Sequence, residues 1–196
     1  MKRRLLVALG AVALVAVLLV GLVQARRSDD GGGTAAKAKA PDAAQTRRAL
    51  SGAPPELAAL HRQADALLPG GAAAFEARLA SLKGYPVVVN AWASWCGPCR
   101  FELPAFQAQS VRLGRRVAFL GINERDADGD ARAFQREFPV SYPSYEDPEG
   151  RIARSYGVQG LPFTVFYAPS GRQVLVHQGP YASEAALLDD IRRYAR

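Results

Sequence analysis

The sequence is poor in residues that cross-link a chain or bind metals: its 196 residues include two cysteines, two histidines and one methionine. The two cysteines, Cys96 and Cys99, are only three residues apart, so disulfides cannot join distant parts of the chain as they do in small secreted proteins. Structural zinc needs about four ligands, and His61 and His177 are distant from the cysteines in sequence. We therefore expect no metal site, and a local redox pair is the interpretation that remains.

Acidic residues are fewer than basic ones, and the formal net charge is +7. Five of the 25 basic residues flank one apolar segment near the N-terminus, which leaves 20 basic against 18 acidic side chains elsewhere. The excess positive charge therefore belongs largely to a membrane-flanking pattern. Because the sequence indicates no concentrated basic face, we expect no nucleic-acid partner.

Long apolar runs are absent except for Leu5 to Val23, which is built of leucine, valine, alanine and glycine. A membrane-spanning helix needs about 20 apolar residues, whereas a signal-peptide core usually has about 7–15. We therefore expect residues 1–27 to form a cytoplasmic tip and a transmembrane anchor. Cleavage near Ala25, where small residues occur, is the alternative. The basic residues before the run favour a cytoplasmic N-terminus, with the rest of the chain outside the cytoplasm.

The segment after the apolar run divides into two parts. Residues 28–53 lack aromatic side chains and an apolar stripe, which predicts a flexible linker. Residues 54–83 predict a helical lead-in of two helices. The first starts at Pro54 and carries leucines at helical spacing as far as Leu68, and the second covers Ala72 to Lys83.

Residues 84–196 show alternating strand and helix patterns. Strands are expected at Pro86–Trp92, Arg116–Asn123, Ser141–Tyr145, Phe163–Tyr167 and Gln173–His177, and helices at Gly97–Val111, Asp130–Phe138, Pro148–Tyr156 and Glu184–Tyr194. Alternating units followed by a hairpin and a last helix predict a three-layer α/β fold, with helices on both faces of a central mixed sheet.

The chemistry lies in the motif Trp95-Cys96-Gly97-Pro98-Cys99, where a predicted strand leads into a predicted helix. Free N–H groups and the dipole at a helix start favour negative charge, so they stabilise the Cys96 thiolate, which is the nucleophile of disulfide exchange. Cys99 lies one turn further in and should be less exposed, so that it attacks the mixed disulfide and releases the product. A structural disulfide or a chance motif is the alternative, but the strand, the helix and the flanking tryptophan favour redox chemistry.

The segment from Val87 to Arg100, with the sequence VVVNAWASWCGPCR, resembles the active-site strand and helix start of thioredoxin-fold proteins. It is most similar to the membrane-anchored, extracytoplasmic thiol–disulfide oxidoreductases of the TlpA/ResA type, over about residues 84–196. The resemblance implies a thioredoxin-like fold, and we expect no cofactor besides the redox-active disulfide. Residues 54–83 do not match the β-hairpin that is common at the start of that family's domain.

The resemblance implies roles for individual residues. Cys96 matches the attacking cysteine, and Cys99 matches the resolving one. Pro162 matches the cis-proline that faces the disulfide, with an ordinary trans proline as the alternative. Glu102 matches an acidic residue beside the active site, with a solvated helix residue as the alternative. Pro104 matches a helix-kinking proline.

Two positions depart from the family pattern. Asn90 stands where cytoplasmic thioredoxins have a buried aspartate, so Glu102 is the natural substitute for handling protons near Cys99. Leu161 precedes the proline where the ResA type often has a hydroxyl residue, which indicates a different substrate preference. Trp95 is expected either to pack or to contact a partner.

Other polar residues near the motif have simpler interpretations. Asp126, Asp128 and Asp130 have the spacing that starts a calcium loop, but the glycine that such a loop requires is not at its place, so a solvated loop and helix cap is expected. Arg100 is a weak candidate for stabilising the thiolate, because an exposed charge is screened.

The leading functional hypothesis is a reductase that takes electrons from a membrane thiol–disulfide donor and reduces disulfides in exported proteins. The resemblance suggests apocytochrome c as one client class, and the Gly97-Pro98 pair favours the reducing direction by analogy to thioredoxin. A disulfide-forming oxidase and a non-catalytic module that binds thiol clients are the alternatives. We expect a monomer in the cell membrane with its domain on the extracytoplasmic side, or a secreted protein if the N-terminal segment is cleaved.

Overall fold

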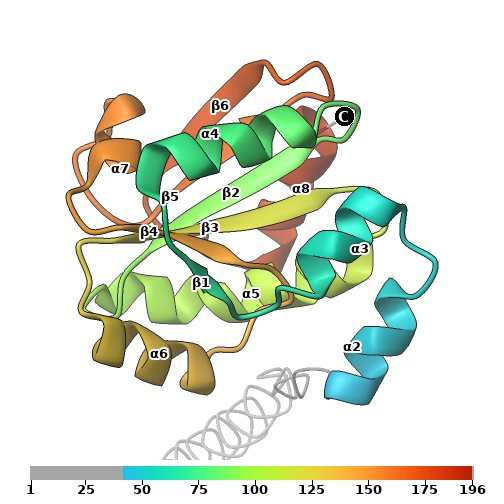
Figure 1. The fold of residues 1–196 in the computed structure, drawn as a ribbon, viewed down its shortest axis with the longest axis horizontal. Coiled ribbons are helices and arrows are strands. Elements are labelled where there is room, and N and C mark those ends of the chain that lie inside the picture. Colours follow the sequence, from blue (N-terminus) through green and yellow to red (C-terminus); the bar gives the residue numbers. More distant parts are fainter. Residues whose placement is uncertain (1–41, 196) are drawn as a thin grey trace, which may run out of the picture. The chain divides into compact units, whose positions relative to one another are not determined.

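The computed structural model describes residues 42–195. Its elements, shown in Figure 1, are α2 (Ala43–Leu50), α3 (Pro55–His61), β1 (Leu67–Leu68), α4 (Gly71–Ser81), β2 (Val87–Trp92), α5 (Gly97–Leu113), β3 (Ala118–Glu124), α6 (Asp128–Glu137), β4 (Ser144–Asp147), α7 (Arg151–Ser155), β5 (Phe163–Tyr167), β6 (Gln173–Gln178) and α8 (Glu184–Tyr194). The predicted anchor, residues 1–27, lies outside the described residues. Between residues 42 and 195, no helix is both long and apolar enough to cross a bilayer.

The six strands form one mixed sheet in the order β1-β4-β3-β2-β5-β6. Strands β1 to β4 are parallel to one another, and β5 and β6 run antiparallel at the other edge. The two central strands, β2 and β3, are buried along their whole length. The predicted mixed sheet is confirmed, and from β2 onward the predicted elements agree with the observed ones to within three residues at each end.

Two apolar clusters cover the two faces of the sheet. Because successive side chains of a strand point to opposite faces, Val88 and Trp92 of β2 enter one cluster, while Val87, Val89 and Ala91 enter the other. The first cluster is completed by α5, α6 and α8, and the second by α3, α4 and α7. Figure 1 shows α4 and α7 on one side of the sheet and α5 and α6 on the other.

The predicted first helix of the lead-in is wrong beyond His61. The helix ends there, and Leu67–Leu68 pair with Ser144 and Tyr145 as an edge strand. Asp65 causes the turn between them: it has a positive φ of 57°, its N–H donates to Tyr142 O, and its carboxylate accepts from Val140 N. The lead-in is therefore part of the sheet and of its core.

The predicted irregular linker is wrong for its last part, because residues 43–50 form α2. Asp42 and Gln45 make a capping box, in which the Asp42 carboxylate accepts from the Ala44 and Gln45 N–H groups and the Gln45 side chain accepts from Asp42 N. Such a box satisfies free donors of the first turn. The buried Leu50 at the other end lies against Gly114, just after α5.

Candidate active site

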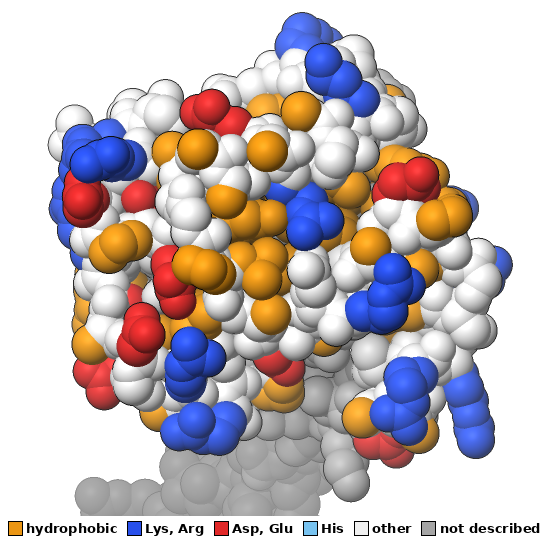
Figure 2. All heavy atoms as spheres, in the orientation of Figure 1, with side chains coloured by type: hydrophobic (Ala, Val, Ile, Leu, Met, Phe, Trp, Pro, Cys, Tyr) orange, Lys and Arg blue, Asp and Glu red, His pale blue; other side chains and the backbone are white. Residues whose placement is uncertain are grey.

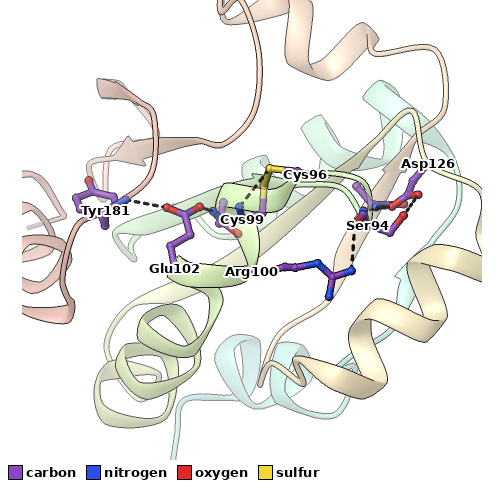
Figure 3. Close-up of a disulfide and its surroundings, with 9 residues drawn as sticks. Ser94, Cys96, Cys99, Arg100, Glu102, Asp126 and Tyr181 are labelled. Carbon is purple, nitrogen blue, oxygen red and sulfur yellow. Dashed lines mark hydrogen bonds between the residues drawn. A yellow bond between two sulfur atoms is a disulfide. The ribbon is translucent and has the colours of Figure 1, made fainter. Parts of the chain in front are cut away.

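The two cysteines form a disulfide at the start of α5 (Figure 3). The buried strand β2 ends at Trp92, and Cys96 is the N-cap of the helix, with its Sγ accepting a hydrogen bond from Cys99 N at 3.3 Å. Cys96 keeps 4% of its surface exposed and Cys99 keeps none, so the predicted order of exposure is confirmed. A Cys96 thiolate at this position faces the free N–H groups of the first helical turn, which favour its negative charge.

Gly97 and Pro98 occupy the first two positions of α5 and are both exposed. Proline suits this position, because it has no N–H to leave unpaired and its fixed φ matches the helix. The loop between the cysteines is therefore open to a partner, while the second cysteine is covered.

The peptide bond between Leu161 and Pro162 is cis, as the resemblance implied. Strand β5 begins at the next residue, and its Phe163 pairs with Ala91 in β2. This register brings Pro162 to the end of β2 from which the motif emerges. Leu161 is partly buried and packs against both apolar clusters.

Glu102 is buried, with 1% of its surface exposed, so the alternative of a solvated helix residue is wrong. It lies one turn after Cys99 on α5, and Figure 3 shows its carboxylate directed toward Tyr181. One carboxylate oxygen accepts from Asn90 Nδ2 at 2.8 Å, and the other accepts from Tyr181 N at 3.0 Å. Burial raises the pKa of Glu102 from 4.5 to about 7, against the opposite effect of these two hydrogen bonds.

Asn90 and Glu102, which were considered together from the sequence, form a hydrogen bond in the structure. Asn90 holds the carboxylate by its amide, and the two groups face each other across the space between β2 and α5. A carboxyl with a pKa of about 7 exchanges its proton readily near neutral pH. Glu102, held by Asn90, can therefore take up or release a proton one helical turn from the buried cysteine.

Asp126 organises the segment before Cys96, a role that was not predicted from the sequence. Its carboxylate accepts from Ser94 N at 2.6 Å, from Ser94 Oγ at 2.5 Å and from Asn123 Nδ2 at 2.8 Å. The adjacent Arg125 has a positive φ of 47°, and its carbonyl accepts from the Trp95 indole N–H at 3.1 Å. The loop after β3 therefore fixes the two residues that lead into the motif.

A signal for Asp126 did exist in the sequence. The predicted strands containing Trp92 and Asn123 are neighbours in a parallel arrangement, and the carboxyl ends of parallel strands meet at one edge of a sheet. A carboxylate just past the second strand is thus expected near the motif that follows the first.

Arg100 is engaged away from the cysteines. Its guanidinium forms a 2.8 Å ion pair with Glu137 and lies over the rings of Phe134 and Phe138, at 4.8 and 5.5 Å from their centroids. It also donates to Ser94 O at 3.4 Å. These contacts bind α5 to α6, so structural packing explains the residue better than thiolate stabilisation does.

Two aromatic side chains that lie close to the cysteines in the sequence are open to solvent. Trp95 is 61% exposed and Phe101 is 84% exposed, and no other large hydrophobic side chain in residues 42–195 is exposed. Trp95 was a candidate from the sequence, but Phe101 was not, because the helical pattern around Phe101 gave no reason to expect it on the surface. In contrast, Trp92 belongs to the core, where it stacks on Phe134. Exposed aromatic rings next to a reactive group are typical of a surface that contacts another protein.

Comparison with known proteins agrees with this geometry. Residues 62–175 match the model of the AhpC/TSA family. A thiol:disulfide interchange protein DsbE homolog of Paracoccus denitrificans is 38% identical over 98 residues, which are 50% of this chain and 52% of the relative. The thiol-disulfide oxidoreductase ResA of Bacillus subtilis is 29% identical over 102 residues, or 52% of this chain and 57% of the relative. The chain thus spans about half the length of the curated relatives that it matches.

Solved structures agree as well. The crystal structure of a putative thiol:disulfide interchange protein DsbE from Chlorobium tepidum superposes with a TM-score of 0.55 and 30% identity. The superposition covers 59% of this chain and 83% of that chain. The chain therefore shares the thioredoxin-like fold with proteins that are named as thiol:disulfide interchange proteins.

Proposed function

Because the chain belongs to the AhpC/TSA family, we propose that it exchanges thiols and disulfides through Cys96 and Cys99, in the reducing direction. The observation that carries the proposal is the disulfide itself: it stands at a helix start, with the exposed Gly97 and Pro98 between its cysteines and a buried carboxyl one turn further on. A cis-proline lies at the end of β2 from which the motif emerges. No further redox group is needed, because the reduced Cys96–Cys99 dithiol supplies the two electrons that a client disulfide takes up and itself becomes the disulfide.

The proposed reaction runs in two steps. In the reduced protein, the Cys96 thiolate attacks one sulfur of a client disulfide, and the client's S–S bond breaks as a mixed disulfide forms. The Cys99 thiol then loses its proton and attacks the Cys96 sulfur, which releases the client's second thiolate. The client gains two electrons, and the protein is left with the Cys96–Cys99 disulfide. The released thiolates take protons from solvent according to pH.

Glu102 serves the second step. Cys99 is fully buried, so its proton needs an acceptor within the protein, and Glu102 lies one helical turn away. With a pKa of about 7, a large fraction of Glu102 is ionised at neutral pH and can accept that proton. Asn90 and the Tyr181 N–H hold the carboxylate in place.

The clients that we propose are folded or partly folded exported proteins with oxidised cysteine pairs, apocytochrome c among them. The exposed Trp95 and Phe101 supply an apolar contact beside the disulfide, which suits a polypeptide better than a small thiol. A membrane thiol–disulfide protein is the proposed electron donor.

We propose that the domain lies outside the cytoplasm, attached by the apolar run at residues 5–23. The support is the length of that run and the basic residues that precede it. A cysteine introduced into the segment between residues 28 and 41 should react with a membrane-impermeant thiol reagent added to intact cells. Labelling only after the membrane is broken would contradict the proposed side.

Trapping of mixed disulfides tests the reaction directly. With Cys99→Ser, the first step still occurs but the second cannot, so clients should accumulate in a covalent complex that dithiothreitol releases. Cys96→Ser is the matched control, because the buried Cys99 cannot replace the attacking thiolate. Equal trapping by both variants, or by neither, would contradict the assigned roles.

A further inference from the structure

The fold gathers basic side chains that are far apart in the sequence. Arg47 and Arg48 lie in the last turn of α2, and Arg112, Arg115 and Arg116 lie in the last turn of α5 and just after it. All five are exposed. We call these five residues the arginine patch. The expectation that no basic face exists is therefore wrong, because two segments separated by more than 60 residues contribute to one.

Direct contacts hold the two parts of the arginine patch together. Gly114 lies between them at the end of α5, where a Cβ would stand 2.7 Å from Leu50 Cδ2 of α2. The guanidinium of Arg115 lies against Gly52, 3.5 Å from the position of a Cβ there. Figure 2 shows several basic side chains at the lower right of the visible face, where Figure 1 places α2.

The arginine patch has no acidic partner within residues 42–195. The ion pairs of this part of the chain involve other residues, and none brings a carboxylate within 4.0 Å of the five guanidinium groups. The nearest acid on α2 is Asp42, at the opposite end of the helix, where it caps the first turn. Concentrated charge that nothing neutralises within the domain favours an external anionic partner.

We propose that the arginine patch binds the anionic lipid surface of the membrane, an inference that rests on the proposed attachment through residues 5–23. Only residues 24–41 separate that run from Asp42, and a segment of this length spans at most about 65 Å even when fully extended. The arginine patch begins immediately afterwards, in α2. Tethering at this distance keeps the local lipid concentration high, so weak contacts are sufficient for binding.

Contact with lipid through the arginine patch also sets the direction of the active site. The patch is at the C-terminal end of α5, and the disulfide is at its N-terminal end, 17 residues earlier. At 1.5 Å per residue, the two ends are about 25 Å apart. A domain held by the arginine patch therefore presents the disulfide, Trp95 and Phe101 away from the bilayer, toward proteins in the adjoining compartment.

The side-chain reactivity of the arginines tests this proposal. The full chain is placed in nanodiscs of phosphatidylcholine alone or with about 30% phosphatidylglycerol, and phenylglyoxal modification of each arginine is followed by mass spectrometry. We expect modification of the arginine patch to slow at least threefold with phosphatidylglycerol and to recover in 0.5 M salt, because ions screen the contact. Two exposed arginines elsewhere, Arg136 on α6 and Arg172 in the turn between β5 and β6, are the internal controls and should not change.

A charge variant separates lipid contact from simple crowding at the membrane. Each arginine near an anionic surface strengthens binding by about fivefold, so Arg47→Gln with Arg48→Gln should remove most of the protection at Arg112, Arg115 and Arg116. The matched pair Arg136→Gln and Arg172→Gln should leave it unchanged. Equal modification rates in both lipids would overturn the proposal. It would also be overturned if an oligonucleotide protected the arginine patch in neutral nanodiscs and phosphatidylglycerol did not.

The same samples distinguish this proposal from the proposed redox function. The rate of reaction with a soluble disulfide should be the same in both lipids and in the Arg47 and Arg48 variant, because these residues are remote from the cysteines. Loss of lipid protection with intact exchange overturns the membrane contact alone. Intact protection without any exchange overturns the redox function and leaves the contact standing.

Discussion

Replacing Glu102 with glutamine isolates the energetic effect of a buried carboxyl beside the active site. Glutamine has the same size, and Asn90 can rotate its amide to accept from the new side-chain NH₂ while the Tyr181 N–H keeps an acceptor. The substitution therefore removes the titration of the group with little change in packing. In the oxidised protein the cysteines do not titrate, so they do not contribute to the comparison.

The raised pKa of Glu102 determines how the free energy of unfolding changes with pH. The folded protein keeps the Glu102 proton up to a pH of about 7, whereas the unfolded chain loses it near 4.5. Between these values the native state binds more protons, so its free energy of unfolding falls as the pH rises. The shift corresponds to a loss of about 3 kcal/mol across this window, which is complete above a pH of about 7.

Urea denaturation of the oxidised wild type and Glu102→Gln, at four pH values between 4.5 and 8, measures this effect. Glu102→Gln should match the wild type near pH 4.5 and exceed its stability by about 3 kcal/mol at pH 8. Asp65, whose pKa burial raises to about 6, also titrates in this range, but its contribution cancels in the difference between the two proteins. If the difference in free energy of unfolding between the two proteins changes by less than about 0.5 kcal/mol from pH 4.5 to 8, Glu102 does not have a raised pKa in the folded protein.

Two further substitutions test the surroundings of the disulfide. Asp126→Ala leaves the donors of Ser94 and Asn123 without their acceptor and should lower the free energy of unfolding by about 2 kcal/mol in urea denaturation, whereas a loss below about 0.5 kcal/mol would contradict the positioning role. Phe101→Ser should slow the reduction of an oxidised protein client about fivefold, which corresponds to about 1 kcal/mol of apolar contact. The same variant should react with a small aromatic disulfide at the wild-type rate, and an equal loss on both substrates would show that Phe101 supports the fold rather than the client.

The sequence was sufficient for the core of the fold and for the centre of the site. The run from Val87 to Trp92 is apolar and β-branched, and the motif that follows has helix-start residues, so strand, cysteines and helix could be located from local patterns alone. The cis bond before Pro162 followed from the resemblance, because that position matched a known motif. The resemblance also singled out Glu102, but its hydrogen bond with Asn90 became visible only in the structure.

The missed features depend on contacts between distant segments. Leu67 and Leu68 have the spacing of a helix, and only the turn at Asp65 and the pairing with β4 make them a strand. The arginine patch needs α2 to fold against the end of α5. Local spacing contains none of this information, although the capping box from Asp42 to Gln45 was visible in the sequence.

The direction of the exchange can be read from the reduction potential of the Cys96–Cys99 pair, measured on the full chain in detergent by equilibration with glutathione and dithiothreitol buffers. We expect a strongly negative value, near the −270 mV typical of thioredoxin, at which the reduced protein can pass two electrons to a client disulfide. A value near −120 mV, typical of a strong oxidant, would contradict the reducing direction and would assign the same cysteines to disulfide formation.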